Sequence, residues 1–227
     1  MDRIRKFFEQ EAQAFDRTIV TVIPHYAQMV EALVRVIPFE ESAALQVIDL
    51  GCGTGTIAKC ILGRFPNSRV TCIDLAENMI AMAQTRLGVR PEIRYVVSDF
   101  NSLEFNAEYD VAVSSLALHH LATDEDKRRF YRRIYDRLHP GGVFYNADVV
   151  LGSSNSLQAV YMNQWRKFMS RDIAQQEIEE KWIPNYEADD RPAKLMDQLA
   201  WLAEIGFSEV DVVWKYFNFA VYGGRKH

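Results

Sequence analysis

The sequence predicts an α/β fold in which a mostly parallel sheet carries helices on both faces. Between residues 46 and 150, apolar strand-like runs alternate with helical segments, a pattern typical of parallel strands joined by right-handed crossovers. The first run ends in Gly51-Cys52-Gly53-Thr54-Gly55, and a helical segment follows it at once. A strand, a glycine turn and a helix N-terminus in this order let a ligand approach the backbone closely.

Composition narrows the class of protein. The chain has 227 residues, of which 48% are apolar and 25% charged, and this balance suits one globular domain. The formal net charge of -5 argues against a strongly basic nucleic-acid binder. The cysteines Cys52, Cys60 and Cys72 form neither a disulfide framework nor a zinc pattern. The chain lacks both an apolar signal core and an apolar run of about 20 residues, so we expect a cytoplasmic protein without a membrane partner.

Residues 1–43 are predicted to form an N-terminal helical cap. Two apolar faces with helical spacing support this prediction. The first face comprises Phe7, Phe8, Ala12 and Phe15, and the second comprises Tyr26, Met29, Leu33 and Ile37. We expect Pro24 in the first turn of the second helix, where its missing N–H is not needed.

Residues 44–150 are predicted to form the ligand-binding core. Strands are expected at 47–50, 70–74, 93–98, 110–115 and 143–149. Helices are expected at 56–65, 76–87 and 124–138. The last of these helices has a capping box in Thr123-Asp124-Glu125-Asp126, and it should end at His139-Pro140-Gly141-Gly142 before the following strand.

The pattern changes after Asp148. Residues 151–190 are predicted to form a helical lid insertion, with a loop at 184–191 at its end. Residues 191–227 should hold a helix from Pro192 to Ile205, closed by Gly206, and an antiparallel hairpin of strands at 210–214 and 216–222. We expect all four parts to belong to one domain.

The glycine turn carries a family resemblance. Its pattern is G-x-G-x-G rather than the dinucleotide pattern G-x-G-x-x-G, because Thr56 stands where the third glycine would be. With Asp49 two positions before the first glycine, residues 44–150 resemble the class I S-adenosylmethionine (SAM) dependent methyltransferases. This resemblance implies a Rossmann-like, seven-stranded, mostly parallel sheet with an antiparallel last strand, SAM as cofactor, and a methyltransferase activity.

The resemblance also implies a cofactor site at successive strand ends, where open α/β sheets bind ligands. Asp74 is expected to accept hydrogen bonds from the ribose hydroxyls, and Asp99 from the adenine amino group. Ser115 is expected beside the amino-acid end of the cofactor. The complete predicted set is Tyr26, Asp49, Gly51, Cys52, Gly53, Gly55, Asp74, Leu75, Met79, Asp99, Phe100 and Ser115. No metal site is predicted.

A narrower resemblance covers both ends of the chain. Ile23-Pro24-His25-Tyr26, Asp190-Arg191-Pro192 and Gly206-Phe207 are similar to the carboxy-SAM synthase branch, in which an arginine placed like Arg191 binds the extra carboxylate of the cofactor. Those synthases have a disturbed glycine turn and an asparagine where this chain has Ser115. Both departures favour an ordinary methyltransferase, and Arg191 then binds an acidic substrate or a loop carboxylate such as Asp189.

Methyl transfer from a sulfonium chiefly requires that the nucleophile be positioned, and a base helps only if that nucleophile arrives protonated. His119 and His120 are the candidate catalytic bases, and the alternative is that they make hydrogen bonds at a helix start. Aromatic residues of the lid either line a substrate pocket or pack the insertion itself. The residues concerned are Tyr161, Trp165, Met169 and Trp182.

We therefore predict a methyltransferase that acts on an oxygen, nitrogen or carbon atom of a small molecule. The first alternative is a carboxy-SAM synthase, or a carboxy-SAM-using enzyme linked to tRNA wobble-uridine modification. The second is a non-catalytic regulatory subunit with the same fold. The basic residues of the helix at 124–138 match the helix dipole better than they suit RNA binding. The sequence leaves a homodimer open.

Overall fold

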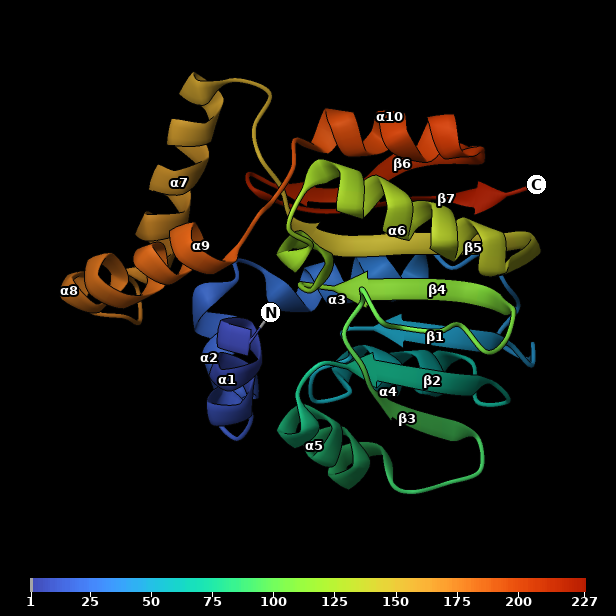
Figure 1. Cartoon of the computed structure of the whole chain (residues 1–227). Helices are drawn as coiled ribbons and strands as arrows, with labels where there is room; N and C mark the ends of the chain where they lie inside the picture. Colours follow the sequence, from blue (N-terminus) through green and yellow to red (C-terminus); the bar gives the residue numbers. More distant parts are fainter. Residues whose placement is uncertain (1) are drawn as a thin grey trace.

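A seven-stranded sheet forms the centre of the molecule, as a computed structural model that describes residues 2–227 shows. Its strand order is β3-β2-β1-β4-β5-β7-β6 (Figure 1). The strands are β1 (Gln46–Leu50), β2 (Arg69–Asp74), β3 (Ile93–Val97), β4 (Tyr109–Ser115), β5 (Leu138–Val149), β6 (Phe207–Tyr216) and β7 (Phe219–Lys226). β7 runs antiparallel to both neighbours, β5 and β6. The predicted mostly parallel sheet with an antiparallel last strand is confirmed.

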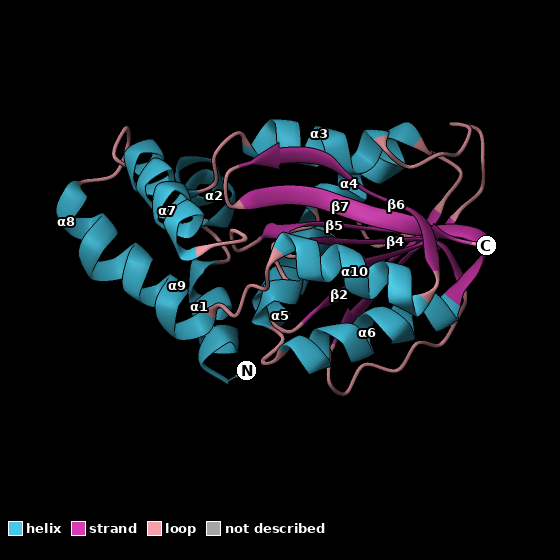
Figure 2. Cartoon of the chain, turned by 90° about the horizontal axis from the view of Figure 1, so that it is seen from above, coloured by secondary structure: helices cyan, strands magenta, loops and turns pink. Residues whose placement is uncertain are grey.

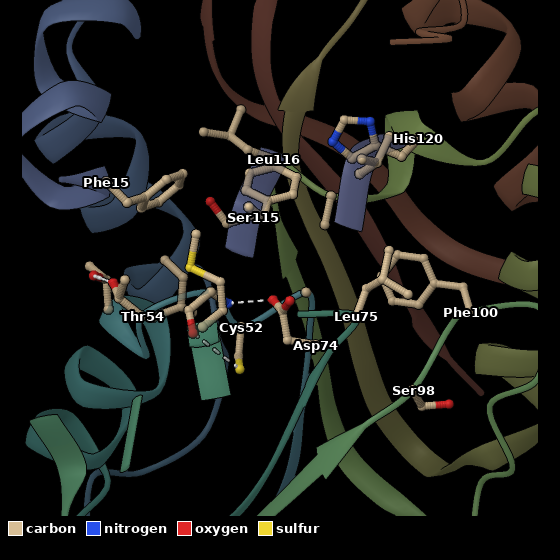
Figure 3. A pocket seen from close by; sticks show the side chains of 18 of the residues that line it. Phe15, Cys52, Thr54, Asp74, Leu75, Ser98, Phe100, Ser115, Leu116 and His120 are labelled. Carbon is tan, nitrogen blue, oxygen red and sulfur yellow. Dashed lines mark hydrogen bonds between the residues drawn. The ribbon is translucent and has the colours of Figure 1, made fainter. Parts of the chain in front are cut away.

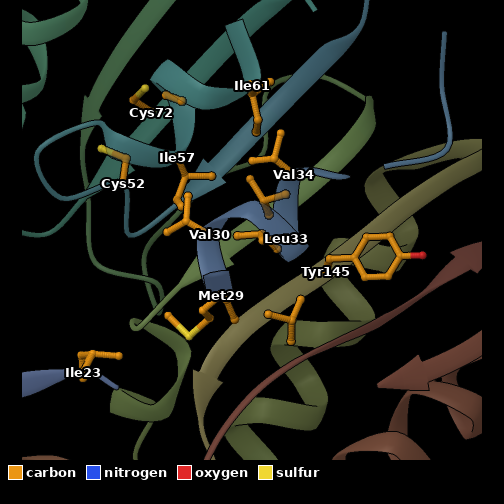
Figure 4. Close-up of a cluster of buried hydrophobic side chains, with 14 of the residues drawn as sticks. Ile23, Met29, Val30, Leu33, Val34, Cys52, Ile57, Ile61, Cys72 and Tyr145 are labelled. Carbon is orange, nitrogen blue, oxygen red and sulfur yellow. The ribbon is translucent and has the colours of Figure 1, made fainter. Parts of the chain in front are cut away.

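Helices cover the two faces of the sheet in separate groups (Figure 2). Along β1, Val47 packs into one core cluster and its neighbour Ile48 into the other, because successive side chains of a strand point to opposite faces. The first cluster includes α3 (Tyr26–Arg35), α4 (Thr56–Arg64) and α5 (Glu77–Leu87). The second includes α6 (Asp124–Arg137) and α10 (Leu195–Ile205). Figure 4 shows Leu33 of α3 beside Ile57 and Ile61 of α4 in the first cluster.

Two further helical groups lie beside the carboxyl ends of the parallel strands (Figure 1). The N-terminal group consists of α1 (Asp2–Glu11) and α2 (Phe15–Val22). The second group consists of α7 (Asn155–Met169), α8 (Gln175–Glu177), the π-helical segment η2 (Ile178–Trp182) and α9 (Ile183–Asp189). The groups are joined by the Trp165 indole, which donates to the carbonyl of Val22 at 2.7 Å. Both groups therefore stand over the end of the sheet where ligands of this fold class bind.

Several predicted helix ends are confirmed. The Thr123 hydroxyl accepts from the Asp126 backbone N–H while the Asp126 carboxylate accepts from the Thr123 N–H, so the capping box of α6 is present. Gly206 closes α10 in the left-handed region, with φ of 116°. The C-terminal hairpin also forms, although β7 lies inside the sheet and β6 alone is at the edge.

Four predicted boundaries are wrong, and each has a local cause. Pro24 precedes α3, which begins at Tyr26 after His25 adopts a left-handed conformation with φ of 54°. β5 already begins at Leu138, which pairs with Tyr109 ahead of a register shift. Residues 183–189 form α9 rather than a loop, since Pro184 lies in its first turn, where no backbone N–H is needed. α10 begins at Leu195 because Leu151 donates to the Ala193 carbonyl at 2.9 Å and keeps the preceding residues extended.

Gly223 should be irreplaceable in the middle of the sheet. A Cβ atom there would lie 2.0 Å from the carbonyl oxygen of Phe144 and 2.8 Å from the Cα of Tyr145. Gly223→Ala should therefore lower the free energy of unfolding by about 3 kcal/mol or more, measured by urea denaturation. Gly63→Ala is the matched control, because a Cβ at this position of α4 meets nothing within 4 Å. It should stabilise the protein by about 0.5 to 1 kcal/mol, and equal effects of the two changes would contradict the packing argument.

Candidate active site

A first cavity, which we call the donor cavity, lies at the carboxyl ends of β1, β2 and β4. Figure 3 shows Asp74 and Cys52 on one side of it and Ser115, Leu116 and His120 on the other. Most of the predicted cofactor residues line this cavity, namely Tyr26, Gly51, Cys52, Gly53, Asp74, Leu75, Met79, Phe100 and Ser115. Asp49, Gly55 and Asp99 do not line it. The structure thus brings together residues from five separate segments of the chain.

The three glycines of the turn fall into two groups according to the space around them. All have positive φ values, which are 76° for Gly51, 51° for Gly53 and 82° for Gly55. A Cβ on Gly51 would lie 2.2 Å from the Cβ of Ala117, and one on Gly55 would lie 3.0 Å from Leu87 Cδ1. A Cβ on Gly53 would meet only Phe15, at 4.0 Å. Gly51 and Gly55 therefore serve backbone packing, whereas Gly53 presents open backbone to the cavity.

Asp74 closes the donor cavity by joining two turns. Its Oδ2 accepts from the backbone N–H of Gly53 at 2.8 Å, and its Oδ1 accepts from that of Ala76 at 2.9 Å. Burial raises the pKa of this carboxyl, and both backbone hydrogen bonds oppose that rise. Each oxygen keeps a second lone pair for a further donor. The carboxylate thus fixes the turn after β1 and remains able to accept from a ligand.

Asp49 lies in β1, two residues before the glycine turn. Its side chain is fully buried in β1, and neither carboxylate oxygen has a hydrogen-bond partner of good geometry among the described residues. Burial raises its pKa to about 7, opposed by the backbone N–H of Ala58 and assisted by the charge of Asp74. Asp49 is therefore partly protonated near neutral pH, and its position supports the turn without reaching the donor cavity.

Asp99 is held by its own turn. Its Oδ1 accepts from the backbone N–H and the side-chain amide of Asn101, both at 2.9 Å. The neighbours Ser98 and Phe100 line the donor cavity instead. A side chain that bonds to the backbone two residues on is an Asx-turn, and this local role accounts for the orientation of Asp99.

A second cavity, which we call the acceptor cavity, adjoins the donor cavity. The two share the side chains of Ile4, Phe8, Phe15, Leu116 and His120. The remaining walls come from α1, α2, the helices at 155–189 and the end of the sheet. They consist mainly of large apolar side chains, namely Phe7, Ile19, Val22, Ile23, Val149, Trp165, Trp182, Tyr186 and Phe219. Trp165 and Trp182 of the predicted lid set line this cavity, whereas Met169 is packed in the core and Tyr161 stacks edge-on against Phe217.

His119 is a buried ion-pair partner in the wall of the acceptor cavity. Its Nδ1 lies 2.5 Å from Oδ1 of Asp148, and its Nε2 lies 3.5 Å from Oδ1 of Asp190. Burial, the largest influence, lowers its pKa, but the two carboxylates outweigh burial and raise it to about 10. His119 is therefore a cation at neutral pH and holds Asp190, at the end of the helical insertion, against the end of β5.

His120 differs from its neighbour His119 in that its ring is neutral. Its Nδ1 lies 3.4 Å from the carbonyl of Asp189 and 3.5 Å from Oδ1 of Asp190, whereas its buried Nε2 has no partner among the described residues. Burial and the charge of His119 lower its pKa to about 4. With acceptors facing Nδ1, the neutral ring carries its proton there, and the buried Nε2 keeps a lone pair without a partner among the described residues. The His120 side chain itself belongs to the wall shared by both cavities.

His119, His120 and Asp190 also offer ligand atoms within 4.8 Å of one another. Two imidazoles and one carboxylate are a donor set that divalent ions use. Here, however, His119 is protonated and both of its ring nitrogens face carboxylates, so this ring offers no lone pair to an ion.

Sequence reasoning missed the polar network behind His119. The Asn146 amide donates to Asp148 Oδ2 at 3.2 Å and to the Tyr222 hydroxyl at 2.9 Å, and Gln198 accepts from Tyr222. The sequence did hold one signal for this network, because Asp148 is a polar residue at the end of a strand, as Asp74 is. The tie of Asp16 to Thr54 at 2.7 Å and to Arg86, which fastens α2 to the glycine turn, had no local signal.

Arg191 does not reach either cavity. Its guanidinium donates to the backbone carbonyls of Ala188 at 2.8 Å and Asp190 at 2.6 Å, and therefore caps the end of α9. A third contact, to the carbonyl of Glu187 at 3.4 Å, completes this cap, since the unpaired carbonyls of a helix end attract a cation. A contact of Arg191 with a carboxylate stays a prediction. Its backbone N–H donates to the carbonyl of His119 at 3.0 Å and so helps to position the insertion.

Comparison with known proteins agrees with this geometry. Residues 47–142 match the family described as Methyltransferase domain. The chain is 27% identical over 140 residues to malonyl-acyl-carrier-protein O-methyltransferase 1 of Ilyobacter polytropus, which covers 62% of this chain and 49% of that protein. It is 26% identical over 222 residues to the carboxy-S-adenosyl-L-methionine synthase of Trichodesmium erythraeum, covering 94% and 85%. The DhpI–SAH complex matches 97% of this chain and 94% of that chain with a TM-score of 0.66 at 18% identity.

The fold and the donor cavity define a Rossmann-like α/β domain with its ligand site at the strand-order switch point. Together with the family matched by residues 47–142, they support the class I SAM-dependent methyltransferase superfamily for this chain. The chain spans about half the length of the malonyl-acyl-carrier-protein methyltransferases that it matches. Among residues 2–227, no helix combines the length and apolar character that crossing a membrane requires.

The raised pKa of Asp49 makes folding stability depend on pH. Between the ordinary carboxyl pKa of 3.8 and about 7, the folded state holds a proton that the unfolded state has lost. Stability contributed by this group is therefore present at low pH and is lost as the pH rises through that window, an effect of about 4 kcal/mol.

Asp49→Asn mimics the protonated acid. In this variant, the free energy of unfolding, measured by urea denaturation from about pH 4 to about pH 8, should fall less with rising pH than in the parent protein. Asp136→Asn on the exposed face of α6 is the control and should follow the parent protein. A pH dependence that is the same in both variants would show that Asp49 is ionised throughout.

Proposed function

We propose that this chain is an enzyme that transfers the methyl group of SAM to an oxygen, nitrogen or carbon atom of a small molecule. The observation that carries the proposal is the meeting of two cavities at His120. One cavity offers backbone and carboxylate acceptors to a polar cofactor, and the other offers an apolar space for an acceptor molecule. In-line transfer needs such an arrangement, with donor and nucleophile brought together away from water.

The residues of the donor cavity fit SAM, which when bound supplies the methyl group on a sulfonium. Gly53 leaves open space along the backbone, and Asp74 keeps free lone pairs for the ribose hydroxyls. The buried Ser115 hydroxyl has no partner among the described residues and is suited to the amino-acid end. For Asp99, the proposed contact with adenine uses Oδ2, since Oδ1 is held by Asn101.

His120 is proposed as the general base for an acceptor that arrives protonated. Its Nε2 is unprotonated and unpartnered at the junction of the cavities. His119 is proposed as a positioning residue, because its ring nitrogens are both occupied by carboxylates. We further propose that residues 1–43 and 151–190 act as cap and lid, and that the protein is cytoplasmic, since Cys52, Cys60 and Cys72 are all free thiols.

The carboxy-SAM alternative is supported by the 94% coverage of the match to the synthase. Against it, no lysine or arginine among the described residues lines the donor cavity, and the guanidinium of Arg191 caps α9. An additional carboxylate on the cofactor would therefore lack a counter-charge. The intact, cavity-lining turn also favours catalysis over a regulatory subunit. A nucleic-acid substrate is disfavoured because Lys127 and Arg133 of α6 already donate to backbone carbonyls.

Asp74→Asn should weaken SAM binding about 10- to 100-fold in calorimetric titration, because a charged acceptor for the ribose hydroxyls is lost. The amide also opposes the N–H of Gly53 or of Ala76, so the midpoint of thermal unfolding should fall as well. The exposed Asp197→Asn on α10 is the control and should change neither quantity. Unchanged affinity in Asp74→Asn would refute the ribose contact.

His120→Ala should lower kcat for a hydroxyl acceptor about 100-fold or more. The depressed pKa keeps this ring neutral in the parent protein, so kcat/KM should stay flat from pH 8 down towards its pKa of about 4. His139→Ala, at the start of β5 and outside both cavities, is the control. A decline of kcat/KM centred near the ordinary histidine pKa of about 6.5 would contradict this assignment.

A further inference from the structure

We infer that the acceptor cavity takes a planar aromatic molecule that carries a hydroxyl or amino group and no negative charge. The inference rests on the proposed methyl transfer and names its substrate class. Three properties of the cavity lead to it: aromatic walls from two separate helical groups, carboxylates beside the histidines in its lining, and the His120 side chain at the junction with the donor cavity.

The walls bring aromatic rings from distant parts of the chain around one space. Phe7, Phe8 and Phe15 come from the N-terminal group, and Trp165, Trp182 and Tyr186 from the helical insertion. Trp165 meets Tyr186 edge-on, with ring centroids 5.2 Å apart and an interplanar angle of 80°. A flat ring between such walls gains edge-to-face and offset contacts in addition to its buried area.

The charges of the lining exclude an acid. Asp189 and Asp190 both line the acceptor cavity, and no lysine or arginine among the described residues does so. Asp189 pairs with the exposed Arg3 at 3.1 Å, and Asp190 pairs with His119. A carboxylate on the acceptor would meet both of these carboxylates, and the charge of His119, which also lines the cavity, is already shared by Asp148 and Asp190. A hydroxyl or an amine, by contrast, donates a hydrogen bond to such a lining.

The position of His120 decides where the nucleophile lies. His120 and Leu116 belong to both cavities, so the reacting atom must lie at this junction while the ring extends towards Trp165 and Trp182. For a hydroxyl acceptor, the oxygen forms its bond to the methyl carbon as the carbon–sulfur bond breaks and sulfur keeps the electron pair. The hydroxyl proton passes to Nε2 of His120 and then to solvent, and S-adenosylhomocysteine and a neutral methyl ether remain.

Calorimetric titration tests the substrate class with three probes that share a hydroxyl group. The protein is first loaded with S-adenosylhomocysteine and then titrated with β-naphthol, with hydroxynaphthoate, and with decanol. Binding of β-naphthol should be tighter than that of hydroxynaphthoate and than that of decanol by about tenfold or more in each case. Hydroxynaphthoate binding as tightly as β-naphthol, decanol binding as tightly, or no binding of any probe would each overturn the inference.

A pair of lid variants locates the binding. Trp182→Ala removes a ring from the wall of the acceptor cavity and should weaken β-naphthol binding about tenfold. Tyr161→Ala changes an aromatic residue of α7 outside both cavities and should leave it unchanged. Equal behaviour of the two variants would overturn the assignment. Failure of the protein to bind SAM or S-adenosylhomocysteine at all would instead contradict the proposed function, so the two failures are distinguishable.

Discussion

The rest of the site depends on the hydrogen bonds that join the turn after β1 to the end of β2. The backbone N–H groups of Gly51 and Cys52 both donate to the carbonyl of Ile73, each at 2.8 Å, and Asp74 accepts from Gly53. Gly51 lies so close to Ala117 that no side chain fits between the turn and the end of β4. The ends of β1, β2 and β4 are thereby locked at fixed distances, and the donor cavity takes its shape from them.

A second buried interaction connects the helical insertion to this rigid end of the sheet. His119 carries its charge between Asp148 and Asp190, and Asp148 also accepts from the amide of Asn146, which donates to the hydroxyl of Tyr222 as well. Charges so deeply buried are expensive to leave unpaired. The insertion therefore docks through a few polar contacts of defined geometry as well as through its aromatic residues. The same contacts leave the neighbouring imidazole neutral.

The sheet, its antiparallel last strand and most of the donor cavity could be predicted from the sequence, because strand ends with a glycine turn or an acidic residue leave local patterns. Asp49, Gly55 and Asp99 belong to the same patterns, but the contacts seen in the structure are buried support for Asp49, packing for Gly55 and a local turn for Asp99. Ligand contacts by these three residues stay predictions. The tie of Asp16 to Arg86 spans 70 residues, and no local pattern reports such a contact. For Arg191, the neighbouring residues along the chain suggested a role in ligand binding. In the structure, its guanidinium donates to a backbone carbonyl at the end of α9.

The placement of α1 has a consequence for both cavities. Ile4 and Phe8 of this helix belong to the walls of both cavities, and Glu9 fastens it to the start of α5 by accepting from Glu77 and Asn78 at 2.7 and 3.0 Å. Because the same two side chains belong to both walls, any displacement of α1 changes the donor and acceptor cavities together rather than one at a time.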